Sequence, residues 1–146
     1  MQLTNDVKIT VVSPAATAAT SAIDSSILDM QGYEGVMFIA LTGDVTSGSV
    51  ITMTVKGNTA NHLTVPTPIT QKATATITAG ATDSDSKALV VDLYKPALRY
   101  VFANITRTTQ DTILGGIIAI QYQAGNKPTT NDASVIASAF GLGVTA

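Results

Sequence analysis

Side chains that carry catalysis or bind metals are few in this sequence, and they do not cluster. His62 is the only histidine, and no partner lies at metal-ligand spacing around it. Residues 82–87, TDSDSK, place oxygen atoms at alternate positions, but the glycine bend and closing glutamate of a calcium loop are missing. We interpret this segment as a solvated loop. Paired acids, a Ser/His/Asp set and a phosphate-binding glycine loop are also missing, so the sequence predicts no enzyme, no cofactor and no bound metal.

One short segment has the composition of a recognition patch. Residues 94–100, YKPALRY, group two aromatic and two cationic side chains around a proline turn. Tyr94, Lys95 and Arg99 are therefore candidate partner contacts. The alternative is that Tyr100 belongs to the core while the two cations point to water.

The elements that must position these side chains are strands, because apolar residues recur with a period of two and the helical period is missing nearly everywhere. Turn signals rich in Gly, Asn and Asp separate the runs. Gly115 and Gly116, inside the last run, indicate a β-bulge or a close approach of another backbone. The predicted strands cover residues 7–12, 22–28, 35–41, 50–56, 62–65, 72–78, 88–94, 98–107 and 112–123.

Two neighbouring runs define the architecture best. Residues 35–41, GVMFIAL, are continuously apolar, which predicts a strand buried on both faces. Residues 50–56, VITMTVK, alternate, with Ile51, Met53 and Val55 pointing inward and threonines outward. Two packed antiparallel sheets supply both environments. Immunoglobulin-like and jelly-roll topologies both fit, and the number of strands favours a jelly roll.

We therefore predict an all-β, antiparallel, jelly-roll-like β-sandwich with extended N- and C-terminal arms. Residues 22–123 form the sandwich domain, residues 1–21 an N-terminal arm or edge strand, and residues 124–146 a C-terminal tail. The side chains predicted to be largely buried are Phe38, Ile39, Met53, Val55, Leu89, Val91, Tyr100, Phe102, Ile118 and Ile120.

The two terminal segments are poor in large apolar residues, so we expect contacts with neighbouring chains to hold them. The first could add a strand to a neighbour's open edge, and the second could fill apolar pockets on an adjacent subunit. The alternative is that both fold back on their own sandwich. Residues 133–140 could form one short helix behind an Asn-Asp cap. The candidate partner contacts in these segments are Val7, Ile9, Val11, Ile136, Phe140 and Leu142.

Composition narrows the class of protein further. Only 12% of the residues are charged and the net charge is -2, so the surface must be covered by hydroxyls and methyls, as suits a docked protein. The absence of cysteine excludes disulfides and cysteine-based metal sites. Basic residues are scattered and no run approaches the ~20 apolar residues of a membrane span, so neither nucleic acid nor membrane is an expected partner. Charges near the N-terminus interrupt any signal-peptide core.

Two longer patterns resemble small structural proteins of tailed bacteriophages. They are GYEGVMFIALTGDVTSGS with ITMTVKGN, and VDLYKPALRYVFANITR with GGIIAIQYQAGNKPTT. The likeness covers roughly residues 30–130 and consists of strand and turn patterns. It implies a capsid decoration (cement) protein, a β-sandwich or jelly roll that docks on the shell as a dimer or trimer.

The sequence-based expectation is therefore a virion structural protein that is made in the host cytoplasm and sits on the capsid surface. Its expected partners are the major capsid protein, whose subunits it bridges, and itself. The alternative is a carbohydrate-binding or adhesin-type β-sandwich module, although aromatic residues make up only 5% and Trp is absent. A jelly-roll hydrolase is disfavoured by the single histidine and the lack of paired acids.

Overall fold

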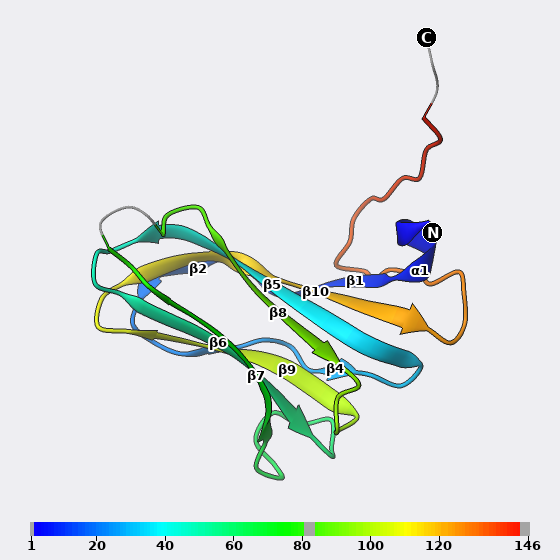
Figure 1. Ribbon diagram of the computed structural model, residues 1–146, viewed down its shortest axis with the longest axis horizontal. Coiled ribbons are helices and arrows are strands. Elements are labelled where there is room, and N and C mark those ends of the chain that lie inside the picture. Colours follow the sequence, from blue (N-terminus) through cyan, green and yellow to red (C-terminus); the bar gives the residue numbers. More distant parts are fainter. Residues whose placement is uncertain (1, 81–83, 144–146) are drawn as a thin grey trace.

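The computed structural model describes residues 2–80 and 84–143, and the chain folds almost entirely into β-strands (Figure 1). One short helix, α1 (Leu3–Asp6), precedes them. The strands are β1 (Lys8–Ser13), β2 (Ala16–Ala19), β3 (Ile23–Asp24), β4 (Leu28–Asp29), β5 (Tyr33–Val45), β6 (Val50–Asn58), β7 (Ile69–Thr78), β8 (Ala88–Tyr94), β9 (Tyr100–Thr108) and β10 (Thr112–Ala124).

The strands form two antiparallel sheets that pack face to face. Sheet A has the order β1-β10-β5-β8, with β2 also paired to β10. Sheet B has the order β3-β9-β6-β7, with β4 also paired to β9. The short strands β1 and β2 share one edge of β10, and β3 and β4 share one edge of β9, so each pair replaces one long strand. The resulting order is that of a jelly roll, and it confirms the predicted all-β sandwich.

Strand β6 has the alternation that its sequence predicts. Ile51, Met53 and Val55 are 0% exposed, and they join the core between the sheets. Thr52 and Thr54 lie on the opposite, outer face of sheet B. Six of the ten predicted core residues are buried: Phe38, Met53, Val55, Leu89, Val91 and Phe102. The other four are only half-buried: Ile39, Tyr100, Ile118 and Ile120.

The prediction that residues 35–41 are buried on both faces is wrong. Val36, Phe38 and Ala40 are 0% exposed and fill the core. Ile39, between them, is half-buried, and Leu41 is 43% exposed. The physical reason is that no second layer within the described residues covers the outer face of sheet A (Figure 1).

The glycine pair in β10 forms a bulge, as predicted. The register of β10 against β5 shifts between Leu114 and Gly116. Gly116 has a φ of 116°, and a Cβ atom there would lie 3.0 Å from the carbonyl oxygen of Ser13. This close approach occurs where the chain leaves β1 and passes through Pro14 toward β2. Both features predicted for this glycine pair, a β-bulge and the close approach of another backbone, therefore occur together.

Three local predictions are wrong. Residues 62–65 form bends instead of a strand, because Pro66 and Pro68 follow directly. The predicted strand at 22–28 is reduced to the two-residue strands β3 and β4. Residues 133–140 form no helix and continue as an extended tail.

We predict that Gly116→Ala destabilises the sandwich. The added methyl group meets Ser13 at 3.0 Å, and a φ of 116° strains any residue other than glycine. The expected loss in the free energy of unfolding is about 1–3 kcal/mol, measured by urea denaturation. Gly141→Ala is the control, because a Cβ atom there meets nothing within 4 Å. Equal midpoints for both variants would contradict this account of the bulge.

Candidate docking surface

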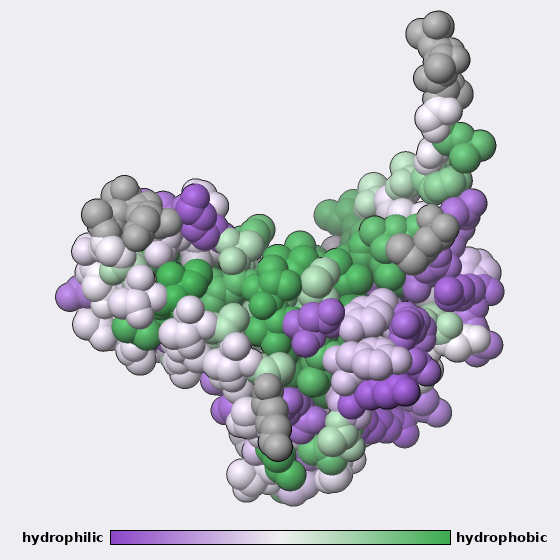
Figure 2. All heavy atoms as spheres, viewed as in Figure 1, coloured by the Kyte–Doolittle hydropathy of each residue, from purple (hydrophilic) through white to green (hydrophobic). Residues whose placement is uncertain are grey.

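Sheet A carries an apolar outer face that crosses its strands from edge to edge. Val90, Ile39, Ile118 and Val11 are successive cross-strand partners on β8, β5, β10 and β1. Val90 is 48% exposed and Val11 is 42% exposed. Figure 2 shows hydrophobic residues gathered in a hollow over β5, β8 and β10. We define the outer apolar face by Val11, Met37, Ile39, Leu41, Val90, Ile118 and Ile120.

The outer face of sheet B has the opposite character. Thr52 of β6 lies between Thr76 of β7 and Thr106 of β9. The hydroxyl groups of Thr52 and Thr76 are 3.1 Å apart and share a hydrogen bond. Thr74 donates a longer bond of 3.4 Å to Thr54. The molecule is therefore one-sided, with a hydroxyl face suited to water on one sheet and an apolar face on the other.

Tyr122 closes one end of the outer apolar face. Its ring lies over Gly35 of β5, in the space that a Cβ atom at position 35 would occupy. Its hydroxyl group donates a 2.6 Å hydrogen bond to Asp92 of β8. Burial and the Asp92 carboxylate raise the pKa of Tyr122 to about 12. The glycine at position 35 thus makes room for a tyrosine that bridges three strands.

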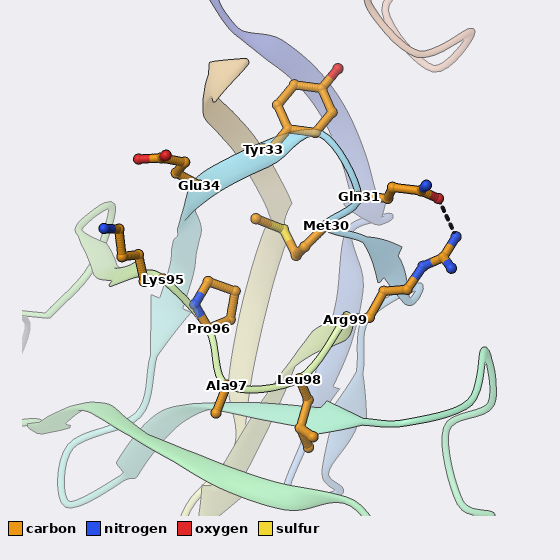
Figure 3. A pocket seen from close by; sticks show the side chains of 9 residues that line it. All are labelled: Met30, Gln31, Tyr33, Glu34, Lys95, Pro96, Ala97, Leu98 and Arg99. Atoms are coloured by element: carbon orange, nitrogen blue, oxygen red, sulfur yellow. Dashed lines mark hydrogen bonds between the residues drawn. The ribbon is translucent and has the colours of Figure 1, made fainter. Parts of the chain in front are cut away.

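The segment after β8 forms a second candidate surface, a groove of about 580 Å³ at one end of the sandwich. Figure 3 shows Met30 at its centre, with Glu34 and Lys95 on one side and Gln31 and Arg99 on the other. Of the predicted recognition patch, residues 95–99 line this concave surface, whereas its two aromatic residues, Tyr94 and Tyr100, do not. The groove is polar at its rim and apolar at its base.

The charged groups at this groove are engaged by other groups of the chain. Arg99 donates two hydrogen bonds, of 2.8 and 2.7 Å, to the carboxylate of Asp29. This fork lowers the pKa of the Asp29 carboxyl group from its ordinary value. Lys95 lies 5.3 Å above the ring of Tyr94, and the Tyr94 hydroxyl group donates to Glu34 at 3.0 Å. Arg99 thus fixes β4 beside the loop, while Tyr94 remains 52% exposed.

The tail first runs along the free edge of β1. Thr129 donates its amide to the carbonyl of Asn5, and Asp132 donates its amide to the carbonyl of Ile9. The Ile9 amide in turn donates to the Asn131 side chain at 3.0 Å, and the Val11 amide donates to Ser134 at 2.9 Å. The edge of β1 is therefore covered by its own chain, which protects it from pairing with another strand.

These contacts decide between the two interpretations of the terminal segments. The strand that carries Ile9 and Val11 pairs with β10, and Val7, directly before it, is only 4% exposed. The hypothesis that this segment adds to a neighbour's sheet edge is therefore wrong, because it is an edge strand of its own sandwich. The rest of the tail differs, since its large side chains remain exposed: Ile136 (99%), Phe140 (51%) and Leu142 (80%).

One structurally important residue was missed by the sequence analysis. Arg107 of β9 is only 3% exposed, and its guanidinium group donates to the carbonyls of Thr17, Ser21 and Thr112 at 2.7–2.9 Å. Burial lowers its pKa from the ordinary value. An arginine at an inward-facing strand position was the available signal. Its role is to hold the segment between β2 and β3 against the end of the sandwich.

The remaining chemical candidates have structural contacts. His62 Nδ1 accepts hydrogen bonds from the amides of Thr64 and Val65, so it stabilises a turn. Of the TDSDSK segment, Thr82 and Asp83 lie outside the described residues, and Asp85 accepts a bond from the Val45 amide. No group of three His, Cys, Asp or Glu side chains within the described part of the chain could hold a metal ion. No described helix has the length and apolar character needed to cross a membrane.

Comparisons with known proteins give only distant likenesses. The sequence matches no protein-family model and no curated protein. A structure reported under "Bacillus endospore appendages form a novel family of disulfide-linked pili" is 15% identical, with a TM-score of 0.49, and the match covers 82% of this chain and 90% of that one. A structure reported under "CBM4 structure and function" is 7% identical, with a TM-score of 0.46 over 81% of this chain and 88% of that one. A chain of Desmodium yellow mottle tymovirus is 9% identical, with a TM-score of 0.32 over 82% and 90%. Likenesses this distant carry no argument about function.

We predict that Tyr122→Phe reduces the loss of stability at alkaline pH. Folding raises the pKa of Tyr122 from 10.0 to about 12, so the fold favours the neutral phenol. The corresponding stabilisation is complete below pH 10 and is lost as the pH rises through about 12. Denaturation midpoints measured across this window should fall less steeply for Tyr122→Phe than for the wild type. Tyr94→Phe, which removes an exposed hydroxyl group, is the matched control, and identical slopes for Tyr122→Phe and the wild type would refute the prediction.

Proposed function

We propose that this protein is a non-catalytic structural protein of a virion, a decoration (cement) protein that docks on a tailed-phage head and bridges coat subunits. The observation that carries the proposal is the outer apolar face of sheet A. Extended apolar patches on soluble monomers are rare and commonly mark interaction sites. A protein that lies flat on a larger surface buries one face and leaves the other in water. The apolar and threonine faces are matched to these two environments.

The partner proposed for this face is the major capsid protein. The low charge of the chain is typical of a protein that is bound to a larger assembly. The strand and turn patterns around Gly35 and Tyr94 also resemble those of phage structural proteins. The outer face of a β-sheet is also rigid, so little conformational entropy is lost when it docks. A rigid apolar face is suited to reinforcing a shell, where the bound protein must resist movement between subunits.

The exposed tail offers fewer apolar side chains for docking on a shell than the outer apolar face does. Burying its three large side chains would contribute about 5–9 kcal/mol, at about 1.5–3 kcal/mol each. Ordering a tail backbone costs about 1–2 kcal/mol per residue, so every residue that docking must order offsets part of that gain. The outer apolar face therefore provides most of the attraction in this proposal, and the tail adds specificity or reach.

One observation favours the second candidate function, a carbohydrate-binding module. The groove after β8 places Tyr33 beside the polar side chains of Gln31 and Glu34. An aromatic ring flanked by hydrogen-bonding groups is suited to a sugar ring, whose faces are apolar and whose edges carry hydroxyls. Screening the purified protein on a glycan array separates the two functions, since a decoration protein is expected to bind none of the glycans.

We predict that Val90→Lys weakens docking on phage heads and leaves the fold intact. Val90 is 48% exposed on the edge strand β8, so the lysine can reach water in the free protein but must be desolvated in the docked one. Co-sedimentation with heads assembled from the coat protein of the same virus should show an affinity at least about tenfold weaker. The control is Thr76→Lys, which lies on the exposed face of β7, an edge strand of sheet B. It should bind like the wild type.

Two results would contradict the proposal. One is wild-type protein that fails to bind such heads under any salt condition. The other is Val90→Lys binding as tightly as Thr76→Lys while both variants melt at the wild-type temperature. The melting temperatures are needed because they show that a binding defect does not arise from unfolding.

A further inference from the structure

An apolar groove lies beside α1, at the Tyr122 end of the outer apolar face. It has a volume of about 450 Å³, and Leu3, Val7, Met37, Ile120 and Tyr122 form most of its lining. Its rim carries an ion pair between Lys127 and Asp6, with nitrogen and oxygen 3.3 Å apart. No described segment of the chain fills the groove, although its lining is mainly apolar.

The tail of the same chain carries apolar side chains without a binding surface of their own. Ile136 is 99% exposed and Leu142 is 80% exposed. The segment from Ala133 to Gly143 contains no charged residue, so it can enter an apolar groove without burying a charge. Figure 1 shows this part of the tail projecting away from the sandwich.

The tail of one chain does not reach its own groove in this arrangement. Leu3, Asp6 and Val7 line the groove, while Thr4 and Asn5, on the other side of the α1 turn, line a separate pocket together with Phe140. Leu142 follows Phe140 by two residues, which span at most about 7 Å. A helical turn with its side chains is about 10 Å across, so Leu142 cannot pass over α1 while Phe140 keeps its place.

We propose that the groove receives the tail of a second copy of this chain, with Leu142 as the apolar anchor. Each copy then donates one tail and accepts one, so exchange closes a homo-oligomer without an unused groove. Size and chemistry agree, because a groove of about 450 Å³ accommodates a leucine side chain with its neighbouring backbone. The occupant is uncharged and the floor is apolar, while the charged pair stays at the rim. Met37 and Ile120 also belong to the outer apolar face, so an exchanged tail would cover the Tyr122 end of that face. The exchange is a property of the free protein and is tested without phage heads.

The absence of cysteine in the sequence allows a direct test by cross-linking. Leu142→Cys and Met37→Cys are made as separate proteins, one with an affinity tag, and are mixed under mild oxidation. A disulfide-linked heterodimer is expected. Leu142→Cys mixed with Thr76→Cys, on the threonine face, is the control and should give at most a trace. A yield from the Met37 mixture no higher than the control would overturn the proposal.

The double variant Leu142→Cys/Met37→Cys distinguishes exchange from self-docking. Exchange predicts cross-links between chains that become rarer on dilution, whereas a cross-link within one chain at every concentration would overturn the proposal. Light scattering provides a second readout, with the wild type larger than a monomer and Ile136→Asp/Leu142→Asp shifted to the monomer. These tail side chains are exposed in the single chain, so the variant should keep the wild-type circular dichroism spectrum, although losing the partner can lower its melting temperature. Both experiments use the isolated protein, so their failure is distinguishable from failure to bind a phage head.

Discussion

The pairing of β10 with β5 is the interaction on which the rest of the structure depends. These strands form the middle of sheet A, and they carry β1, β2 and β8 on their outer edges. The bulge at Gly115 and Gly116 shifts the register between the two strands, and so determines which side chains of β10 face the core on either side of it. Leu114 and Ile117 are an odd number of residues apart, yet both are buried in the core. Without the bulge, one half of β10 would turn its large side chains to the wrong face. A pair of glycines thus determines which apolar residues form the core and which form the outer face.

The fold could be predicted wherever one face of a strand is apolar and the other polar. Strand β6 is such a case, because its threonines can only face water or one another. Residues 35–41 could not be assigned in the same way, since a continuous apolar run is identical whether a second layer, a partner or solvent lies outside it. The predicted helix at 133–140 failed because small residues favour a helix only when one face packs against something. The short helix α1 gave no recognisable sequence signal.

The candidate site was only partly visible in the sequence, because its geometry depends on distant pairings. Tyr94, Lys95 and Arg99 were identified from their composition, and two of them, Lys95 and Arg99, line a groove. The partner of Arg99 is Asp29, 70 residues earlier, so the salt bridge could not be inferred from spacing. Tyr122 gave no signal alone, since its place over a glycine of β5 depends on the register between two strands. Local composition therefore revealed the groups, and register determined their roles.

A half-exposed apolar face raises the question of how the chain avoids aggregation. The two edges of sheet A are treated differently. The tail covers the edge of β1 with main-chain and side-chain hydrogen bonds, whereas β8 pairs with no described strand other than β5. A net charge of -2 gives little repulsion between copies, so electrostatics does not keep such faces apart. The threonine hydroxyl groups on the outer face of sheet B bind water there, but they do not make the outer apolar face of sheet A more soluble. The outer apolar face and the tail are therefore the two surfaces that partners would cover in the proposals made above. A closed exchange of tails would cover the tail and the Tyr122 end of the outer apolar face, and would leave the remainder of that face free to dock.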